Sequence, residues 1–262
     1  MINTTIENGV ATLTLAGPGR KNALSPEMLE ALTGSIETLR RDASVRALVL
    51  TGEGGDFCSG GDVSSMQGPS DAAAVRQRMA ASQRPCTALA SFERPVIAAV
   101  DGVAFGAGFS LALMADFVVA SDRARFCLAF ARIGLVPDFG ALHTLPRMIG
   151  VQRARELIYS ARELSACEAQ ELGLVLEVVS ADALHARAYE FARAMAAQSP
   201  DGFAMTKRLL AQTFERDLGA LLDAEAAAQA IALTSPYVRE AAARFVRKEP
   251  PAFRWPQRGK SD

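Results

Sequence analysis

The first 180 residues alternate between short apolar runs rich in β-branched residues and stretches with helical periodicity. Residues 47–51 and 95–100 read as buried strands because each is a continuous apolar run bounded by glycine or aspartate. Residues 2–6 and 10–15 alternate around Glu7-Asn8-Gly9, and Asn-Gly between alternating runs predicts a β-hairpin. The chain is therefore expected to open with paired strands.

Helices are predicted from caps and apolar spacing. Ser25-Pro26 is typical of an N-cap and a first helical residue, and the apolar positions that follow lie on one helix face: Leu29, Leu32, Ile36 and Leu39. A longer helix is predicted over 71–92. Ser165 and Glu168 have the spacing of a capping box, and Gly173 is expected to end that short helix.

The pattern changes after about residue 180, where only helices are predicted. Further strands are predicted at 116–120, 126–128 and 174–179, and the later helices at 184–198, 200–210, 218–233 and 236–247. Alternating strands and helices followed by helices alone indicate an α/β core with a helical appendage. We place the core at residues 1–200 and a C-terminal helical region at 201–262.

Charge and composition narrow the function. The chain has 28 basic and 29 acidic residues, a net charge of −1 and no dominant charge run, so neither nucleic acid nor a membrane surface is an expected partner. No apolar run reaches the roughly 18 residues of a membrane-spanning helix, and no signal peptide is evident at the N-terminus.

The four cysteines argue against two kinds of site. Cys58, Cys86, Cys127 and Cys167 are scattered, with no Cys-x-x-Cys and no histidine pair nearby. We therefore expect no zinc site and no disulfide framework, and we expect a reducing, cytoplasmic location.

Two predicted strands end in turns of small residues. The strand at 95–100 runs into residues 101–108 and then an apolar helical segment at 109–115. Backbone N–H groups at such a helix start carry partial positive charge, and small residues let a ligand oxygen approach them. The turn either binds an oxygen that develops negative charge or only packs a helix closely on a strand. A dinucleotide fingerprint fails because Leu111 takes the place of its last glycine, and a phosphate loop would need an absent Gly-Lys-Ser/Thr.

The second such turn follows the strand at 47–51 and includes Ser59. A nucleophilic role for Ser59 is disfavoured, because the chain has no Gly-x-Ser-x-Gly elbow and neither of its histidines, His143 and His185, pairs with it in the sequence. The backbone N–H of Ser59 is the more useful group.

Asp138 is an isolated carboxylate in the apolar segment 133–140. Apolar surroundings raise the pKa of a carboxyl, which suits a general base. Local sequence alone slightly favours the alternative, in which Asp138 is the N-cap of a helix beginning near Gly140.

Taken together, these motifs resemble the crotonase superfamily of enoyl-CoA hydratases and isomerases, and the resemblance runs nearly end to end. The similar segments are residues 20–24, 57–62, 101–108, 133–138, 145–150, 169–173 and 245–248. The resemblance implies a spiral of β-β-α units whose C-terminal helical region assembles subunits into a homotrimer or hexamer.

The resemblance also implies a site for an acyl-CoA thioester. The backbone amides of Ser59 and Ala107 would hold the thioester oxygen, and Asp138 would act as acid and base. Coenzyme A would be bound as part of the substrate, with no separate cofactor, by residues from three regions: Arg20, Lys21, Ala23, Phe57, Gly61, Asp62 and Lys248. From the residues alone, Arg20 and Lys21 are solvated loop cations unless a phosphate-bearing ligand lies beside them.

Departures from the family pattern guide the choice of reaction. Hydratases of this family carry two glutamates, and the matching positions here are Ser110 and Phe130. Asp138, by contrast, matches the acidic residue of isomerase-type members, such as those resembling the ring-opening isomerase of phenylacetyl-CoA degradation. The leading hypothesis is a double-bond isomerase; an enoyl-CoA hydratase and a non-catalytic acyl-CoA-binding protein are the alternatives. Four phenylalanines line an acyl pocket or belong to the ordinary core: Phe105, Phe109, Phe130 and Phe139.

Overall fold

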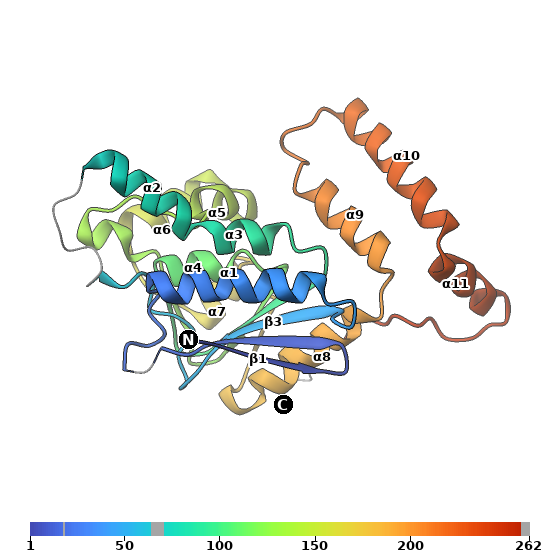
Figure 1. The fold of residues 1–262 in the computed structure, drawn as a ribbon, viewed down its shortest axis with the longest axis horizontal. Helices are drawn as coiled ribbons and strands as arrows, with labels where there is room; N and C mark the ends of the chain where they lie inside the picture. Colours follow the sequence, from blue (N-terminus) through green and yellow to red (C-terminus); the bar gives the residue numbers. More distant parts are fainter. Residues whose placement is uncertain (18, 64–70, 258–262) are drawn as a thin grey trace.

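The computed structural model describes residues 1–17, 19–63 and 71–257. Its main element is a six-stranded sheet with the strand order β1-β2-β3-β4-β6-β9 (Figure 1). The strands are β1 (Ile2–Glu7), β2 (Val10–Leu15), β3 (Ala47–Gly52), β4 (Val96–Val100), β6 (Phe117–Ser121) and β9 (Glu177–Val179). The first two strands are antiparallel and the remaining neighbours pair in parallel.

A second sheet of three short strands lies beside the first. It consists of β5 (Val103–Phe105), β7 (Arg125–Cys127) and β8 (Leu164–Ser165), in that order. The helices of the core are α1 (Pro26–Arg41), α2 (Ala72–Ser82), α3 (Arg84–Ala90), α4 (Ala107–Ala112), η2 (Ala129–Ile133), α5 (Ala141–Ile149), α6 (Val151–Ser160), α7 (Ala166–Glu171), η3 (Ala181–Ala183) and α8 (Leu184–Ala196).

Both faces of the large sheet are buried, as its continuous apolar strands predict. Leu48 and Leu50 of β3 face the larger core cluster, which includes α1 and α3. Val49, between them, faces a second cluster that includes Phe191 of α8. Figure 1 accordingly shows α1 and α3 on one side of the strands and α8 on the other.

The predicted hairpin is confirmed: β1 and β2 pair over their full length, and Asn8 and Gly9 at the turn have φ values of 47° and 79°. The single helix predicted over 71–92 is wrong. The segment forms α2 and α3, separated at Gln83, and Pro85 lies in the first turn of α3, where a proline with no N–H is tolerated.

The strand predicted at 174–179 is shorter than expected. The N–H groups of Leu174 and Val175 donate to the carbonyl of Ala169, at the end of α7, so pairing with β6 begins only at Leu176. The capping box of Ser165 and Glu168 is confirmed, and Gly173 follows α7 with a φ of 78°.

The C-terminal arm comprises α9 (Pro200–Leu210), α10 (Leu218–Thr234) and α11 (Pro236–Val246). In Figure 1 the arm extends away from the sheet. None of the residues described in α9 and α10 is buried. The domain boundary at residue 200 stays a prediction. No helix in the described residues is long and apolar enough to cross a membrane.

A largely buried ion pair ties the arm to the core. The Nζ of Lys207 on α9 lies 2.8 Å from Oδ2 of Asp116, which also accepts a 2.8 Å hydrogen bond from the N–H of Val96. Burial raises the pKa of Asp116, and the Lys207 charge opposes that rise. Removing one partner therefore leaves a buried charge without compensation.

We predict that Lys207→Met lowers the free energy of unfolding by about 3 kcal/mol, because the buried Asp116 loses the positive charge that compensates its burial. The control is Arg208→Met on the same helix, since the Arg208–Glu93 pair is 64% and 57% exposed and should contribute less than about 1 kcal/mol. Chemical denaturation at pH 7 measures both variants. Equal losses for the two variants would show that the buried pair does not anchor α9.

Candidate active site

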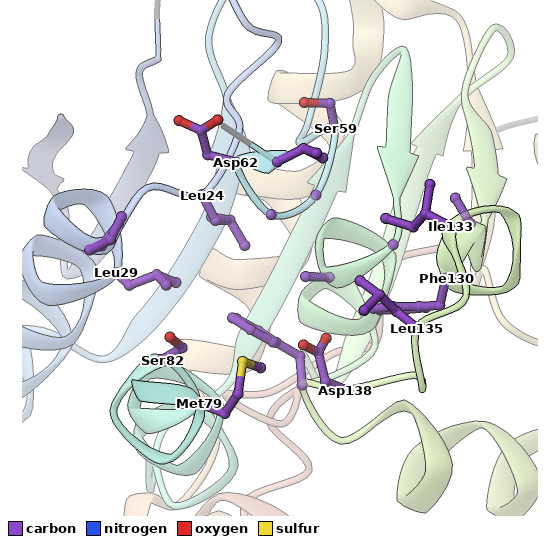
Figure 2. A pocket seen from close by; sticks show the side chains of 18 of the residues that line it. Leu24, Leu29, Ser59, Asp62, Met79, Ser82, Phe130, Ile133, Leu135 and Asp138 are labelled. Carbon is purple, nitrogen blue, oxygen red and sulfur yellow. The ribbon is translucent and has the colours of Figure 1, made fainter. Parts of the chain in front are cut away.

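A largely apolar cavity of about 320 Å³ opens between α1, α2, the segment after β3 and the segment before α5. Its walls include Leu24, Leu29, Met79, Phe130 and Ile133 (Figure 2). Three predicted site residues, Ser59, Ala107 and Asp138, line this same cavity. The fold therefore brings together groups that lie up to about eighty positions apart in the sequence.

The amide of Ser59 is not available to a ligand. Its N–H donates a 2.9 Å hydrogen bond to the carbonyl of Lys21, and its hydroxyl donates to the carbonyl of Arg20. The predicted role of the Ser59 N–H as an oxyanion donor is therefore wrong, because this N–H is already hydrogen-bonded to the loop at 20–22.

The N–H of Gly61 is a candidate donor, a role that the sequence did not suggest for this residue. Leu24 forms a parallel bridge with Gly61, in which the Leu24 N–H donates to Gly60 and the Leu24 carbonyl accepts from Asp62. In such a bridge the amide of the middle residue points to the opposite side. Gly61 lines the cavity, and no acceptor for its N–H is found among the residues that the structure describes.

The other candidate donor is Ala107, the residue named from the sequence. It is the first residue of α4, so its N–H has no acceptor inside the helix. A Cβ placed on Gly60 would lie 3.6 Å from the Ala107 nitrogen and 2.8 Å from the Phe105 carbonyl oxygen. Gly60, with a φ of +103°, thus lets the 59–62 segment approach α4 closely.

Asp138 presents a carboxyl oxygen without a partner. Its Oδ1 is shielded from solvent and has no hydrogen bond within the described part of the chain. Burial raises the pKa of Asp138 to about 6. The alternative of an N-cap is wrong, because α5 begins at Ala141 after Gly140 and has no side-chain cap.

Cys86 of α3 faces Asp138. Burial, and then the negative charge of Asp138, raise the pKa of the Cys86 thiol to about 12, so the thiol is neutral at physiological pH. Asp138 thus has no charged partner in Cys86. Its neighbour Phe139 has a φ of 53°, a left-handed conformation that costs a bulky residue on the order of 1–2 kcal/mol.

Comparison with known proteins decides the family. A profile of the family "Enoyl-CoA hydratase/isomerase" matches residues 5–256. The chain belongs to the enoyl-CoA hydratase/isomerase family. Its crotonase-like α/β fold is confirmed by a solved enoyl-CoA hydratase/isomerase from Cupriavidus metallidurans CH34, with a TM-score of 0.93, 41% identity and 98% of each chain covered.

Relatives in this family have differing activities in their names. The 1,2-epoxyphenylacetyl-CoA isomerase of Escherichia coli K12 is 37% identical over 95% of this chain and 96% of its own length. A probable enoyl-CoA hydratase of Rhodobacter capsulatus is 38% identical over 95% of each chain. Family membership therefore establishes an enzyme of the hydratase/isomerase type without choosing between the two reactions.

The positions where hydratases of the family carry glutamates hold no acid here. Ser110 is fully buried, and its hydroxyl donates to the carbonyl of Gly106. Phe130 forms part of the cavity wall. The other carboxylate on the cavity belongs to Asp62, which pairs with Arg20 at 2.6 Å.

The residues predicted to bind coenzyme A lie at different distances from the cavity. Asp62 and Gly61 line the cavity, and Arg20 and Lys21 lie beside it in an exposed loop, where Lys21 pairs with Asp56 at 3.5 Å. Ala23 is half-buried in the same loop, between Asn22 and Leu24. The loop is held by Asn22, whose side chain bonds to the backbone of Gly17, Glu53 and Asp56.

Two of the predicted coenzyme A contacts are not supported. Phe57 is fully buried in the main core, so its side chain is closed to a ligand. Lys248 follows α11 at the end of the arm, and Figure 1 shows α11 far from α2 and α4, so this chain does not bring Lys248 to the cavity.

Of the four phenylalanines considered for an acyl pocket, two line the cavity and two do not. Phe130 and Phe139 line the cavity. Phe109 is a core residue whose ring lies 5.1 Å from that of Phe126, and Phe105 is not among the cavity-lining residues. Among the described residues, no group of three or more histidine, cysteine, aspartate or glutamate side chains is placed to hold a metal ion.

The raised pKa of Asp138 predicts a pH-dependent stability. Because the folded-state pKa of about 6 exceeds the usual 3.8, the folded protein loses stability as pH rises between these values. Asp138→Asn removes that penalty. The difference in unfolding free energy, variant minus wild type, should grow by on the order of 1 kcal/mol from pH 4 to pH 8, a value reduced for the partial exposure of the carboxyl.

Denaturant melts at the two pH values measure this difference. Glu27→Gln is a matched control, because Glu27 lies on α1 and its pKa is lowered rather than raised. An Asp138→Asn difference that shrinks with rising pH would contradict a raised pKa.

Proposed function

We propose that this enzyme isomerises the double bond of an enoyl-CoA thioester, with one carboxylate moving one proton. The observation that carries the proposal is one cavity lined by Asp138, Gly61 and Ala107. Among the residues that the structure describes, Oδ1 of Asp138 has no hydrogen-bond partner and the Gly61 and Ala107 amides have no acceptor. A 1,3-proton shift requires one group that first accepts and then donates a proton, together with donors for the oxygen that becomes negative.

The mechanism follows from these roles. The Asp138 carboxylate removes a proton from C2 of a 3-enoyl thioester, and the electron pair moves into a dienolate whose charge lies largely on the thioester oxygen. The N–H groups of Gly61 and Ala107 stabilise that oxygen; removing one such donor typically costs about 2.7–4 kcal/mol of transition-state stabilisation. Protonated Asp138 then returns the proton to C4, which yields the 2-enoyl thioester and restores the carboxylate.

The environment of Asp138 suits this cycle. With a pKa of about 6, the carboxyl is ionised at neutral pH and is a stronger base than an ordinary aspartate. The apolar walls around it also limit the water that would quench a dienolate. An isomerase reading agrees with the name of the E. coli relative, 1,2-epoxyphenylacetyl-CoA isomerase.

An enoyl-CoA hydratase is the second candidate, supported by the names of several relatives. Asp138 would then have to activate a water and also supply the proton, without the two glutamates of the family's hydratases. A non-catalytic acyl-CoA-binding protein is the third candidate. It would keep the cavity and the Arg20-Lys21 loop for the nucleotide of coenzyme A, and would transfer no proton.

Substrate binding, assembly and location belong to the same proposal. Coenzyme A would enter as part of the substrate, with Arg20 and Lys21 near its phosphates, and no separate cofactor is required by the mechanism. The largely exposed helices of the C-terminal arm suit a homotrimer or hexamer. A cytoplasmic location remains an expectation from cysteine usage.

We predict that Asp138→Asn lowers isomerisation of a 3-enoyl-CoA by 10²–10⁴-fold, because the acid and base is lost. Binding of a saturated acyl-CoA, measured by calorimetry, should change little. Exchange of C2 protons with deuterated solvent, followed by NMR, isolates the first step. Isomerisation at the wild-type rate in this variant would exclude Asp138, and wild-type protein that binds without any exchange would favour the non-catalytic candidate.

The pH profile gives a further expectation. The kcat/KM for isomerisation should fall below an apparent pKa near 6, since only ionised Asp138 accepts the proton. Crotonyl-CoA, offered at the optimal pH, should lose its conjugated-thioester absorbance very slowly. Rapid hydration of crotonyl-CoA would favour the hydratase candidate instead.

A further inference from the structure

The turn that carries Asp138 has an unusual residue at its centre. The N–H of Ala141 donates to the carbonyl of Asp138 at 3.1 Å, and the two central residues, Phe139 and Gly140, have φ values of 53° and 80°. Two left-handed central residues define a turn of the type I′ class, which favours Asn-Gly. A phenylalanine at φ > 0 is an outlier.

Another turn in this chain has a similar backbone shape and can be compared with the Asp138 turn. The β1–β2 hairpin has nearly the same central φ values, 47° and 79°, and fills them with Asn8-Gly9, the favoured pair. At the Asp138 turn the second central residue is again a glycine, but the first is Phe139 instead of the favoured asparagine. Something other than turn preference therefore determines the residue at 139.

Packing on both sides fixes this turn. The Phe139 side chain is only 4% exposed, belongs to the main core cluster and lines the cavity. On the other side, a Cβ on Gly140 would lie 2.7 Å from Cε of Met114, so the backbone at 140 rests against the residues that follow α4. A strained residue persists only where its surroundings over-determine its conformation.

We propose that Phe139 is a positioning residue: its buried ring holds the left-handed turn and thereby keeps the Asp138 side chain on the cavity, with Oδ1 lacking a hydrogen-bond partner among the described residues. The inference rests on the proposed function of Asp138. A ring that served only the core would not require the left-handed backbone, whereas a ring that anchors this turn holds Asp138 in place through the adjacent peptide.

Other charged and titratable groups near Asp138 do not account for the raised pKa of its carboxyl. Cys86 from α3 is neutral, and Asp62, from the segment after β3, pairs with Arg20. From η2, Arg132 lines the cavity but donates to the Ala161 carbonyl, and its Nη2 lies 3.5 Å from Glu163. Arg78 of α2 lines the cavity as well, with an exposed side chain. None of these groups contributes to the shift in the pKa of Asp138, which comes from burial.

The test separates the ring from the backbone shape. Phe139→Asn and Phe139→Gly suit a type I′ turn and remove the ring, whereas Phe139→Leu keeps an apolar anchor in an unfavourable conformation. We expect the Asn and Gly variants to lose at least tenfold in kcat, and their acid limb of kcat/KM to move down by one pH unit or more from about 6. Phe139→Leu should keep its acid limb within half a unit.

Leu29→Ala is the matched control, because it removes apolar surface from the α1 wall of the same cavity without touching the turn. It should change KM for the acyl group and leave the acid limb in place. Wild-type kcat and acid limb in Phe139→Asn or Phe139→Gly would overturn the proposal. Failure of both variants to fold would assign Phe139 to the core alone and would overturn it too.

The proposed function is tested separately in the same assay. If Asp138→Asn exchanges C2 protons normally, the proposed function fails whatever the Phe139 variants do. If Asp138→Asn is inactive and the Phe139 variants retain wild-type kcat and pH dependence, only the positioning role fails.

Discussion

The site depends on one buried carboxyl oxygen, Oδ1 of Asp138, which has no hydrogen-bond partner in the described part of the chain. A buried acceptor without a partner costs free energy, and a buried charge costs more, so such a group persists only where the fold holds it. Here Asp138 is held between the core anchor of Phe139 and the start of α5. The same cost that destabilises the carboxylate makes it a better base, which links the stability of the fold directly to the proposed reaction.

Close approach of backbone is the second requirement. The two segments that carry the Gly61 and Ala107 amides follow β3 and β4, parallel neighbours whose carboxyl ends lie at the same edge of the sheet. Side chains would keep these segments apart, since a Cβ on Gly60 would lie 2.8 Å from the Phe105 carbonyl oxygen and one on Gly108 would lie 2.4 Å from that of Cys58. Small residues therefore permit two donors on one cavity, and Asp138 on the same cavity suits a proton shift better than addition of water.

Sequence alone predicted the elements whose signals are local. Asn8-Gly9 located the hairpin, and the caps Ser25 and Ser165 located helix starts. The choice of Ser59 failed because amide direction in that segment depends on a bridge to Leu24 and on the φ of Gly60, which are set by a loop some forty residues away. The strain at Phe139 was likewise invisible, because nothing in the sequence Pro-Asp-Phe-Gly reveals a left-handed phenylalanine.

The position of the thioester oxygen tests the proposed mechanism most directly. A crystal structure of the Asp138→Asn protein with a saturated acyl-CoA would locate the thioester oxygen directly. Our account predicts that this oxygen lies within hydrogen-bond distance of both the Gly61 and Ala107 nitrogens, with the residue 138 side chain beside C2 and C4 of the acyl chain. A thioester oxygen bound elsewhere, or residue 138 on the far side of the cavity from C2, would contradict it.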